Sequence, residues 1–298
     1  MIGVKPDGAG VLGDWGSPRR GRAGEGDRVM SATDGSEVFR SDRRLFMNTV
    51  LAAGTALFSG TAATVAADEN SAEHPLQAAL REVREAHRLV RKMSSYECTF
   101  TKKEVVDDDL ISQKMKLKIR HDPFSVYMLF QEPREGREVI FVTGQNDNKL
   151  LVHETGLAAL IGTLSLSPED PRVKAENRYP ITKAGMANMV QGVIEQWEAE
   201  TMYGECDVKY FSDAKVEDYT CRVIESSHPQ PRKQFPFQMT RLWIDEKTQL
   251  AVRVQQFGFP KKKDAKPPVI EDYLFTDVQP DLRFTDRDFD TDNPAYNY

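Results

Sequence analysis

The three cysteines are the residues of this sequence best suited to covalent chemistry. Cys206 and Cys221 flank a predicted hairpin with its turn at Asp213-Ala214, and in that register they face each other. Opposite positions on antiparallel strands lie about 4.5–5.5 Å apart between Cα atoms, within reach of a disulfide. The sequence therefore predicts either a Cys206–Cys221 disulfide or two reduced, buried cysteines, with Cys98 left over in both cases.

Catalytic and metal-binding signatures are missing from the sequence. It contains no G-x-S-x-G, H-E-x-x-H, phosphate-loop or G-x-G-x-x-G motif. His153-Glu154 begins like a zinc motif, but Leu157 stands where the second histidine belongs. The alternating aspartates at 286, 288, 290 and 292 start like a calcium loop, but Thr291 replaces its glycine. We interpret the aspartates as a charged edge strand, and we predict a non-enzymatic protein without a catalytic site, metal or cofactor.

An export signal is the clearest functional motif. Arg43-Arg44, followed by Leu45-Phe46-Met47, resembles the twin-arginine export consensus, and an uncharged stretch rich in Ala, Gly and Thr follows it. That stretch is too weakly apolar for a permanent membrane span, and the small residues ending at Ala67 predict cleavage there. We predict that 1–40 is disordered or an over-called N-terminus and that 41–67 is a twin-arginine-type signal peptide. The mature protein is then exported to the periplasm or cell envelope. A Sec signal and an uncleaved anchor are the alternatives.

The charge balance narrows the class of partner. The chain has 40 basic and 46 acidic residues, a formal net charge of −6. A dedicated nucleic-acid binder needs a basic footprint, so the sequence excludes that class. The short basic run Lys261–Lys263 is interpreted as a solvated loop, which leaves at most a peripheral membrane contact. The oligomeric state is left open by these features.

Two amphipathic helices and about ten strands make up the rest of the chain. Apolar residues recur at helical spacing from His74 to Met93 and again from Thr182 to Tyr203. Between and after these helices, short alternating segments are separated by turn residues. The pattern predicts a single α+β domain over 74–298, in which a strongly curved antiparallel sheet forms an incomplete barrel wrapped around the two helices.

A barrel of this kind either fills its interior with side chains or holds a ligand. The segment Gly156–Leu166 is unusually apolar, and it is either a buried turn of helix or a lid over an apolar cavity. The residues expected to line such a hydrophobic ligand cavity are Phe100, Leu117, Ile119, Tyr127, Leu129, Ile140, Val142, Leu151 and Leu160.

Five segments carry a family resemblance: Tyr96–Phe100, Arg120–Pro123, Gly144–His153, Leu242–Arg253 and Phe284–Tyr296. Their order and sequences resemble an uncharacterised family of exported bacterial proteins with a domain of unknown function. More remotely, the chain is similar to the Lol-type outer-membrane lipoprotein carriers. That similarity implies an incomplete antiparallel barrel with helices as a lid over an apolar cavity for acyl chains.

One position departs from the carriers. They tend to have a basic residue shortly after the proline of the hairpin, and it is associated with lid closure. Here Phe124–Met128, directly after Pro123, carries no charge. The sequence therefore predicts an exported binding protein that carries lipid or lipoprotein acyl chains, without that closure device. An envelope structural or interaction protein with a filled core is the alternative, and a hydrolase with an unrecognised site is the least favoured.

Overall fold

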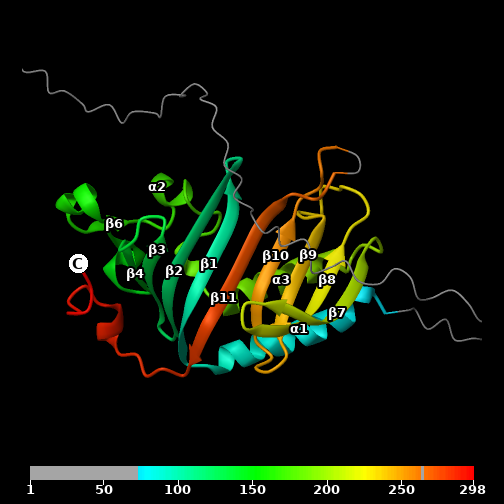
Figure 1. The fold of residues 1–298 in the computed structure, drawn as a ribbon, viewed down its shortest axis with the longest axis horizontal. Helices are drawn as coiled ribbons and strands as arrows, with labels where there is room; N and C mark the ends of the chain where they lie inside the picture. The colour runs from blue at the N-terminus through cyan, green and yellow to red at the C-terminus, as the bar shows by residue number, and fades with distance from the viewer. Residues whose placement is uncertain (1–72, 263–264) are drawn as a thin grey trace, which may run out of the picture. The chain divides into compact units, whose positions relative to one another are not determined.

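Eleven strands of the described chain form one antiparallel sheet. The computed structural model describes residues 73–262 and 265–298, so the predicted signal residues Arg43, Arg44 and Ala67 lie outside the described residues. The strand order is β6-β5-β4-β3-β2-β1-β11-β10-β9-β8-β7, with β6 and β7 at the two edges (Figure 1). The sheet is not closed, because its two edge strands do not pair with each other. The prediction of an open antiparallel sheet with two long helices is confirmed.

The strands and helices have the following bounds, given in chain order. The strands are β1 Ser95–Val106, β2 Asp109–His121, β3 Phe124–Glu132, β4 Glu138–Val142, β5 Leu150–His153, β6 Leu164–Leu166, β7 Asp207–Val216, β8 Tyr219–Ser227, β9 Met239–Asp245, β10 Ala251–Phe257 and β11 Val269–Pro280. The helices are α1 Pro75–Lys92, α2 Pro171–Lys174 and α3 Met186–Glu200, and the 3₁₀ turns are η2 Asn146–Asn148, η3 Gly156–Ile161, η4 Ile181–Lys183 and η5 Asp286–Phe289. In this part of the chain, no helix is long and apolar enough to cross a membrane.

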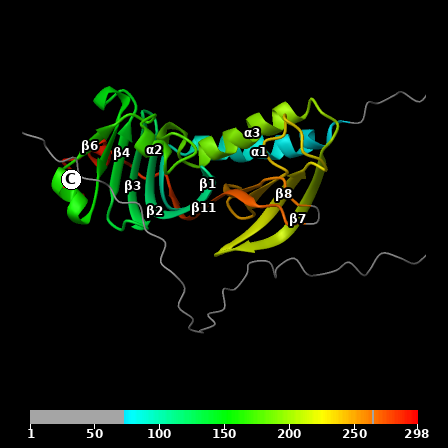
Figure 2. The ribbon, with the colours of Figure 1, turned by 90° about the horizontal axis from the view of Figure 1, so that it is seen from above.

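Helices α1 and α3 lie side by side on one face of the sheet, called here the helix face (Figure 2). Pro75 starts α1, and the Nδ1 atom of His74 accepts a hydrogen bond from the Leu76 amide at 3.2 Å. Helix α3 begins four residues later than predicted. Thr182 lies in the separate turn η4, and Gly185, with a φ of +92°, redirects the chain. The apolar stripes of both helices pack against β8, β9 and β10 through residues such as Leu80 and Trp197, which are fully buried.

The C-terminal segment 283–298 covers the opposite face of β3, β4 and β5, called here the tail face (Figure 1). The rings of Tyr127 and Tyr296 stack at 4.0 Å between centroids, and the Tyr298 hydroxyl donates to the Leu151 carbonyl at 3.1 Å. The aspartates of this segment form no edge strand, which corrects that prediction. The residues around Asp286 and Asp288 make η5 instead, because the Thr285 and Asp288 side chains cap that turn.

The predicted cysteine register is wrong. The β7–β8 turn lies at Glu217-Asp218, and Ala214 is the residue that faces Cys221. Cys206 precedes β7, where its Sγ lies 3.3 Å from the Ser226 Oγ. All three cysteines are free and buried, which agrees with the alternative of reduced cysteines. Burial raises the pKa of the Cys221 thiol to about 12, so this thiol stays protonated at neutral pH.

Candidate functional site: a covered apolar cavity

A cavity of about 780 Å³ lies on the helix face beside α3. Small-molecule sites in proteins commonly enclose about 300–1,000 Å³, and the volume of this cavity falls within that range. Its apolar walls come from β1–β6 and β11: Phe100, Met115, Met128, Phe130, Val139, Leu150, Val152, Leu164, Leu166 and Phe275.

Strand alternation explains why these residues share one face. On β1, Phe100 points into the cavity together with Lys102 and Glu104, two and four residues further along. Antiparallel pairing places Met115 of β2 directly opposite Phe100, and Phe130 of β3 directly opposite Met115. The three side chains therefore form one continuous apolar floor across neighbouring strands.

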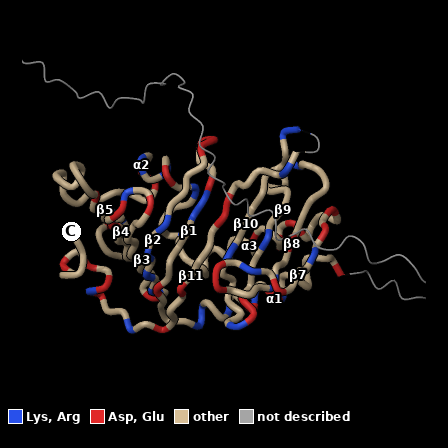
Figure 3. The backbone as a smooth tube through the Cα atoms, viewed as in Figure 1, with Lys and Arg blue, Asp and Glu red and all other residues tan. Residues whose placement is uncertain are grey.

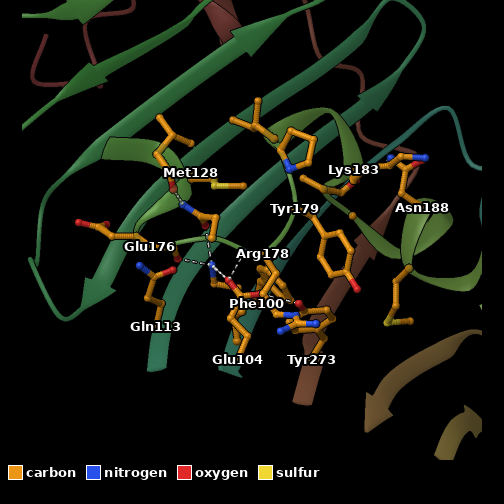
Figure 4. A pocket seen from close by; sticks show the side chains of 18 of the residues that line it. Phe100, Glu104, Gln113, Met128, Glu176, Arg178, Tyr179, Lys183, Asn188 and Tyr273 are labelled. Carbon is orange, nitrogen blue, oxygen red and sulfur yellow. Dashed lines mark hydrogen bonds and ion pairs between the residues drawn. The ribbon is translucent and has the colours of Figure 1, made fainter. Parts of the chain in front are cut away.

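The cavity is covered by a segment we call the strap, residues 171–185. It runs from α2 through η4 to the start of α3. Val173, Ile181 and Ala184 of the strap line the cavity, while Tyr179 stands at its mouth and is 46% exposed (Figure 4). Few apolar residues reach down from the strap, so it spans the space without filling it.

Charged groups of β1 hold the strap above the floor. The ammonium of Lys102 lies 2.7 Å from Glu104 Oε1, and it donates to Asn177 Oδ1 at 2.6 Å and to the Glu176 carbonyl at 3.2 Å. The amide of Arg178 donates to Glu104 Oε1 at 3.2 Å. Lys102 is 7% exposed and Glu104 1% exposed, so these contacts are sheltered from water. Burial lowers the pKa of Lys102, and the carboxylate of Glu104 counteracts part of that shift.

Glu271 of β11 makes a second attachment. Its Oε1 accepts from Arg178 Nε and from the Tyr179 hydroxyl, both at 2.8 Å. The neighbouring Tyr273 hydroxyl donates to Glu104 Oε2 at 2.5 Å, which links the two attachments (Figure 4). Burial raises the pKa of Glu271, although its contacts with Tyr179 and Arg178 oppose the shift. The two attachments together fix the strap residues 176–179.

A third attachment lies at the rim beside the β3–β4 connection. Arg137 Nη2 is 2.5 Å from Glu154 Oε1, and Arg137 Nη1 is 2.8 Å from Glu176 Oε2. Arg134 reaches the other oxygen of Glu176 at 2.8 Å. The charged side chains Arg134, Arg137, Glu154 and Glu176 therefore pair with one another at this part of the rim.

The structure brings only part of the predicted lining together. Phe100 lines the cavity. Leu117 is fully buried on the same face, and Ile119 lines a smaller cavity of about 300 Å³ near the start of α3. Leu160 is 85% exposed and lines neither cavity, because η3 projects away from the sheet. Within the segment Gly156–Leu166, the turn η3 is therefore exposed and lies outside the cavity lining, whereas Leu164 and Leu166 of β6 line the cavity.

Five predicted lining residues lie on the tail face instead, under the C-terminal segment: Tyr127, Leu129, Ile140, Val142 and Leu151. Both faces of β3 and β4 are apolar, so the alternation of hydrophobicity did not distinguish the two faces. Met128, Phe130 and Val139, one position away along these strands, occupy the cavity wall that we assigned to their neighbours. The signal that distinguishes them is the aromatic C-terminal segment, which needs an apolar surface to cover.

The fold and the site define a class: an open antiparallel sheet curved around helices, with a covered apolar cavity on the helix face. The chain belongs to the DUF1571 family, described as proteins of unknown function, whose sequence profile matches residues 93–298. No curated protein matches the sequence.

Solved structures resemble the chain at low identity. The lipoprotein LppX of Mycobacterium tuberculosis is 12% identical, with a TM-score of 0.41, covering 70% of this chain and 98% of that one. A DUF1329 family protein from Desulfovibrio piger is 11% identical, with a TM-score of 0.32, covering 73% and 98%. A LolA superfamily protein from Nitrosomonas europaea is 9% identical, with a TM-score of 0.21, covering 71% and 97%.

Proposed function

We propose that this protein is an exported, non-enzymatic binding protein that carries the acyl chains of a lipid or lipoprotein in the cavity under the strap. The cavity of about 780 Å³ with an apolar floor supports this proposal above all. Empty apolar space of that size costs stability, because its lining side chains lose contacts on one side. An acyl chain restores those contacts without requiring hydrogen-bond partners.

The site's polarity favours a ligand with an apolar body and a polar end. Apolar side chains cover the floor, whereas the strap and the adjoining surface of α3 bring exposed polar groups such as Lys183 and Glu195 to the mouth. An acyl chain would lie on the floor, and its polar end would remain in water at the mouth. The alternative of a structural protein with a filled core has less support, because this half of the sheet is not filled.

A substitution at Gly192 tests the proposal. Gly192 lies on α3 at the mouth of the cavity, and a Cβ atom placed there meets nothing within 4 Å. We expect Gly192→Phe to occupy the mouth and to lower binding of a fluorescent fatty-acid analogue by at least about tenfold, since a ring of that size displaces several methylene contacts. Native mass spectrometry should then show less co-purifying lipid.

Gly192→Ala is the matched control, because it also replaces the glycine with a residue that favours a helix more, but it adds only a methyl group. It should bind the analogue as the unchanged protein does. Equal binding by the Phe and Ala variants, or a purified protein free of lipid that ignores the analogue, would contradict the proposal.

A further inference from the structure

The connection between β5 and β6 carries three exposed aliphatic side chains that the cavity does not use. Leu157, Leu160 and Ile161 of η3 are 88%, 85% and 67% exposed. We call them the apolar knob. The knob extends beyond the edge strand β6 at one end of the sheet (Figure 1). Exposed aliphatic residues gathered at one projecting turn mark an interaction site more often than solitary ones do.

Glycines flank the knob and let it project. Gly156 and Gly162 have φ values of +63° and +79°, and a Cβ atom at either position meets nothing within 4 Å. The surrounding sequence is also free of charge: from Thr155 to Ser167 there is no Asp, Glu, Lys or Arg. The tube in Figure 3 shows this end of the sheet without charged residues along that turn.

We propose that the apolar knob inserts into the surface of a phospholipid bilayer. A protein partner is a poorer occupant, since a stable protein interface takes about 20–30 residues from each side, and this turn offers three aliphatic side chains on a convex tip. The knob has twelve side-chain carbons, about as many as one myristoyl chain, which binds membranes with an association constant of about 10⁴ M⁻¹. The knob therefore supports weak, reversible attachment.

The position of the knob relates this attachment to the proposed carrier role. Val152 of β5 and Leu164 and Leu166 of β6 line the cavity, and η3 joins these two strands. Insertion of the knob would bring that end of the cavity to the bilayer, where an acyl chain enters or leaves. This second step rests on the proposed function, whereas insertion by itself does not.

Vesicle binding tests the insertion. The protein is purified from cells that export it. Mass spectrometry verifies that all variants share the same N-terminus. Phosphatidylcholine vesicles are the probe. We expect the unchanged protein to sediment with the vesicles at low and at high salt, because no charge is involved. Replacing all three residues, L157S with L160S and I161S, should lower the partition coefficient by about tenfold for each side chain.

Leu110→Ser is the matched control. Leu110 lies near the β1–β2 turn and is 62% exposed, so its loss should leave vesicle binding unchanged. A second variant, Leu160→Trp, should shift its added fluorescence to shorter wavelength when vesicles are present. The triple variant should unfold at the unchanged temperature, since its replaced side chains are exposed.

Lipid binding and vesicle binding test the cavity and the knob independently. The triple variant should keep its co-purified lipid, and Gly192→Phe should still bind vesicles. The insertion is overturned if the unchanged protein ignores vesicles, if the triple variant binds as well as it does, or if high salt abolishes binding. If the unchanged protein binds vesicles but holds no lipid and ignores the fatty-acid analogue, the carrier role alone is overturned.

Discussion

The two halves of the sheet have apolar faces that are covered in different ways. Over β7–β10, which we call the filled half, α1 and α3 pack their apolar stripes directly onto the sheet, and Leu80, Val83 and Trp197 are completely buried. Over β1–β6, the hollow half, the strap provides the cover and leaves about 780 Å³ beneath it. Both halves have apolar floors, so the cover alone decides whether a core or a cavity results.

The difference lies in the chemistry of the two covers. A helix presents an apolar stripe along its whole length, whereas the strap alternates a few apolar residues with charged ones such as Glu176 and Arg178. Arg178 forms an ion pair with Glu271 of β11, and Glu176 pairs with Arg137 at the rim. Hydrogen bonds to Lys102 and Glu104 attach the strap to β1. A cover fastened at its edges by ionic groups can remain in place without filling the space below.

Removing one buried charge should have the largest effect. Lys102→Met leaves the carboxylate of Glu104 without its ammonium partner at 1% exposure, and we expect a loss of about 3–5 kcal/mol of unfolding free energy, measured by urea denaturation. Lys174→Met is the control, since its contact with Glu169 is exposed and its loss should change little. A negligible effect of Lys102→Met would show that the strap is held by other forces.

Truncating one buried leucine in each half should give the next largest effects, and the two losses of unfolding free energy should differ. Leu80→Ala in the filled half should cost about 3 kcal/mol, because it opens a cavity among packed atoms. Leu150→Ala in the hollow half should cost about 2 kcal/mol in the lipid-free protein, because one side of Leu150 already faces empty space. Equal losses in urea denaturation would mean that the hollow half is packed as tightly as the filled half.

The smallest effect concerns His228, where the connection between β8 and β9 meets the end of α3. Its Nε2 lies 3.2 Å from Glu200 Oε2, and its Nδ1 lies 2.8 Å from the Glu205 carbonyl. Burial alone would lower the pKa of His228, but contacts with Glu200 and Glu205 outweigh it and raise the pKa above 6.5. The same connection brings Phe237 to the wall of the cavity.

A raised pKa in the folded state means that the native protein holds the proton more tightly than the unfolded chain. The resulting stability is complete below pH 6.5, the value of an unperturbed histidine, and is lost as the pH rises through the folded-state pKa. Thermal unfolding across that range should show the decline, and His228→Gln should remove it. His87→Gln should leave it in place, because burial lowers the pKa of His87. A decline that persists in His228→Gln would assign it to other groups.

The sequence by itself determined the class of fold. Helical periodicity around Leu76 and Val83 and the alternation in strands such as Met115–Ile119 depend only on neighbouring residues, so they can be read locally. The open antiparallel sheet and its two long helices follow from these patterns. An apolar cavity could also be predicted from the sequence, because the strands between the helices are too apolar to be left uncovered.

Only the tertiary structure decided which apolar residues line the cavity. Tyr127 and Met128 are adjacent and both apolar enough for a core, and a shift of one residue exchanges their faces. The C-terminal segment covers the first, more than 150 residues later in the chain, and the cavity receives the second. The partner of Cys221 was also decided by the structure, because the turn at Glu217-Asp218 sets the register and places Ala214 opposite Cys221. Which apolar face lines the cavity depends on contact with a distant segment, and the local alternation of hydrophobicity does not carry that information.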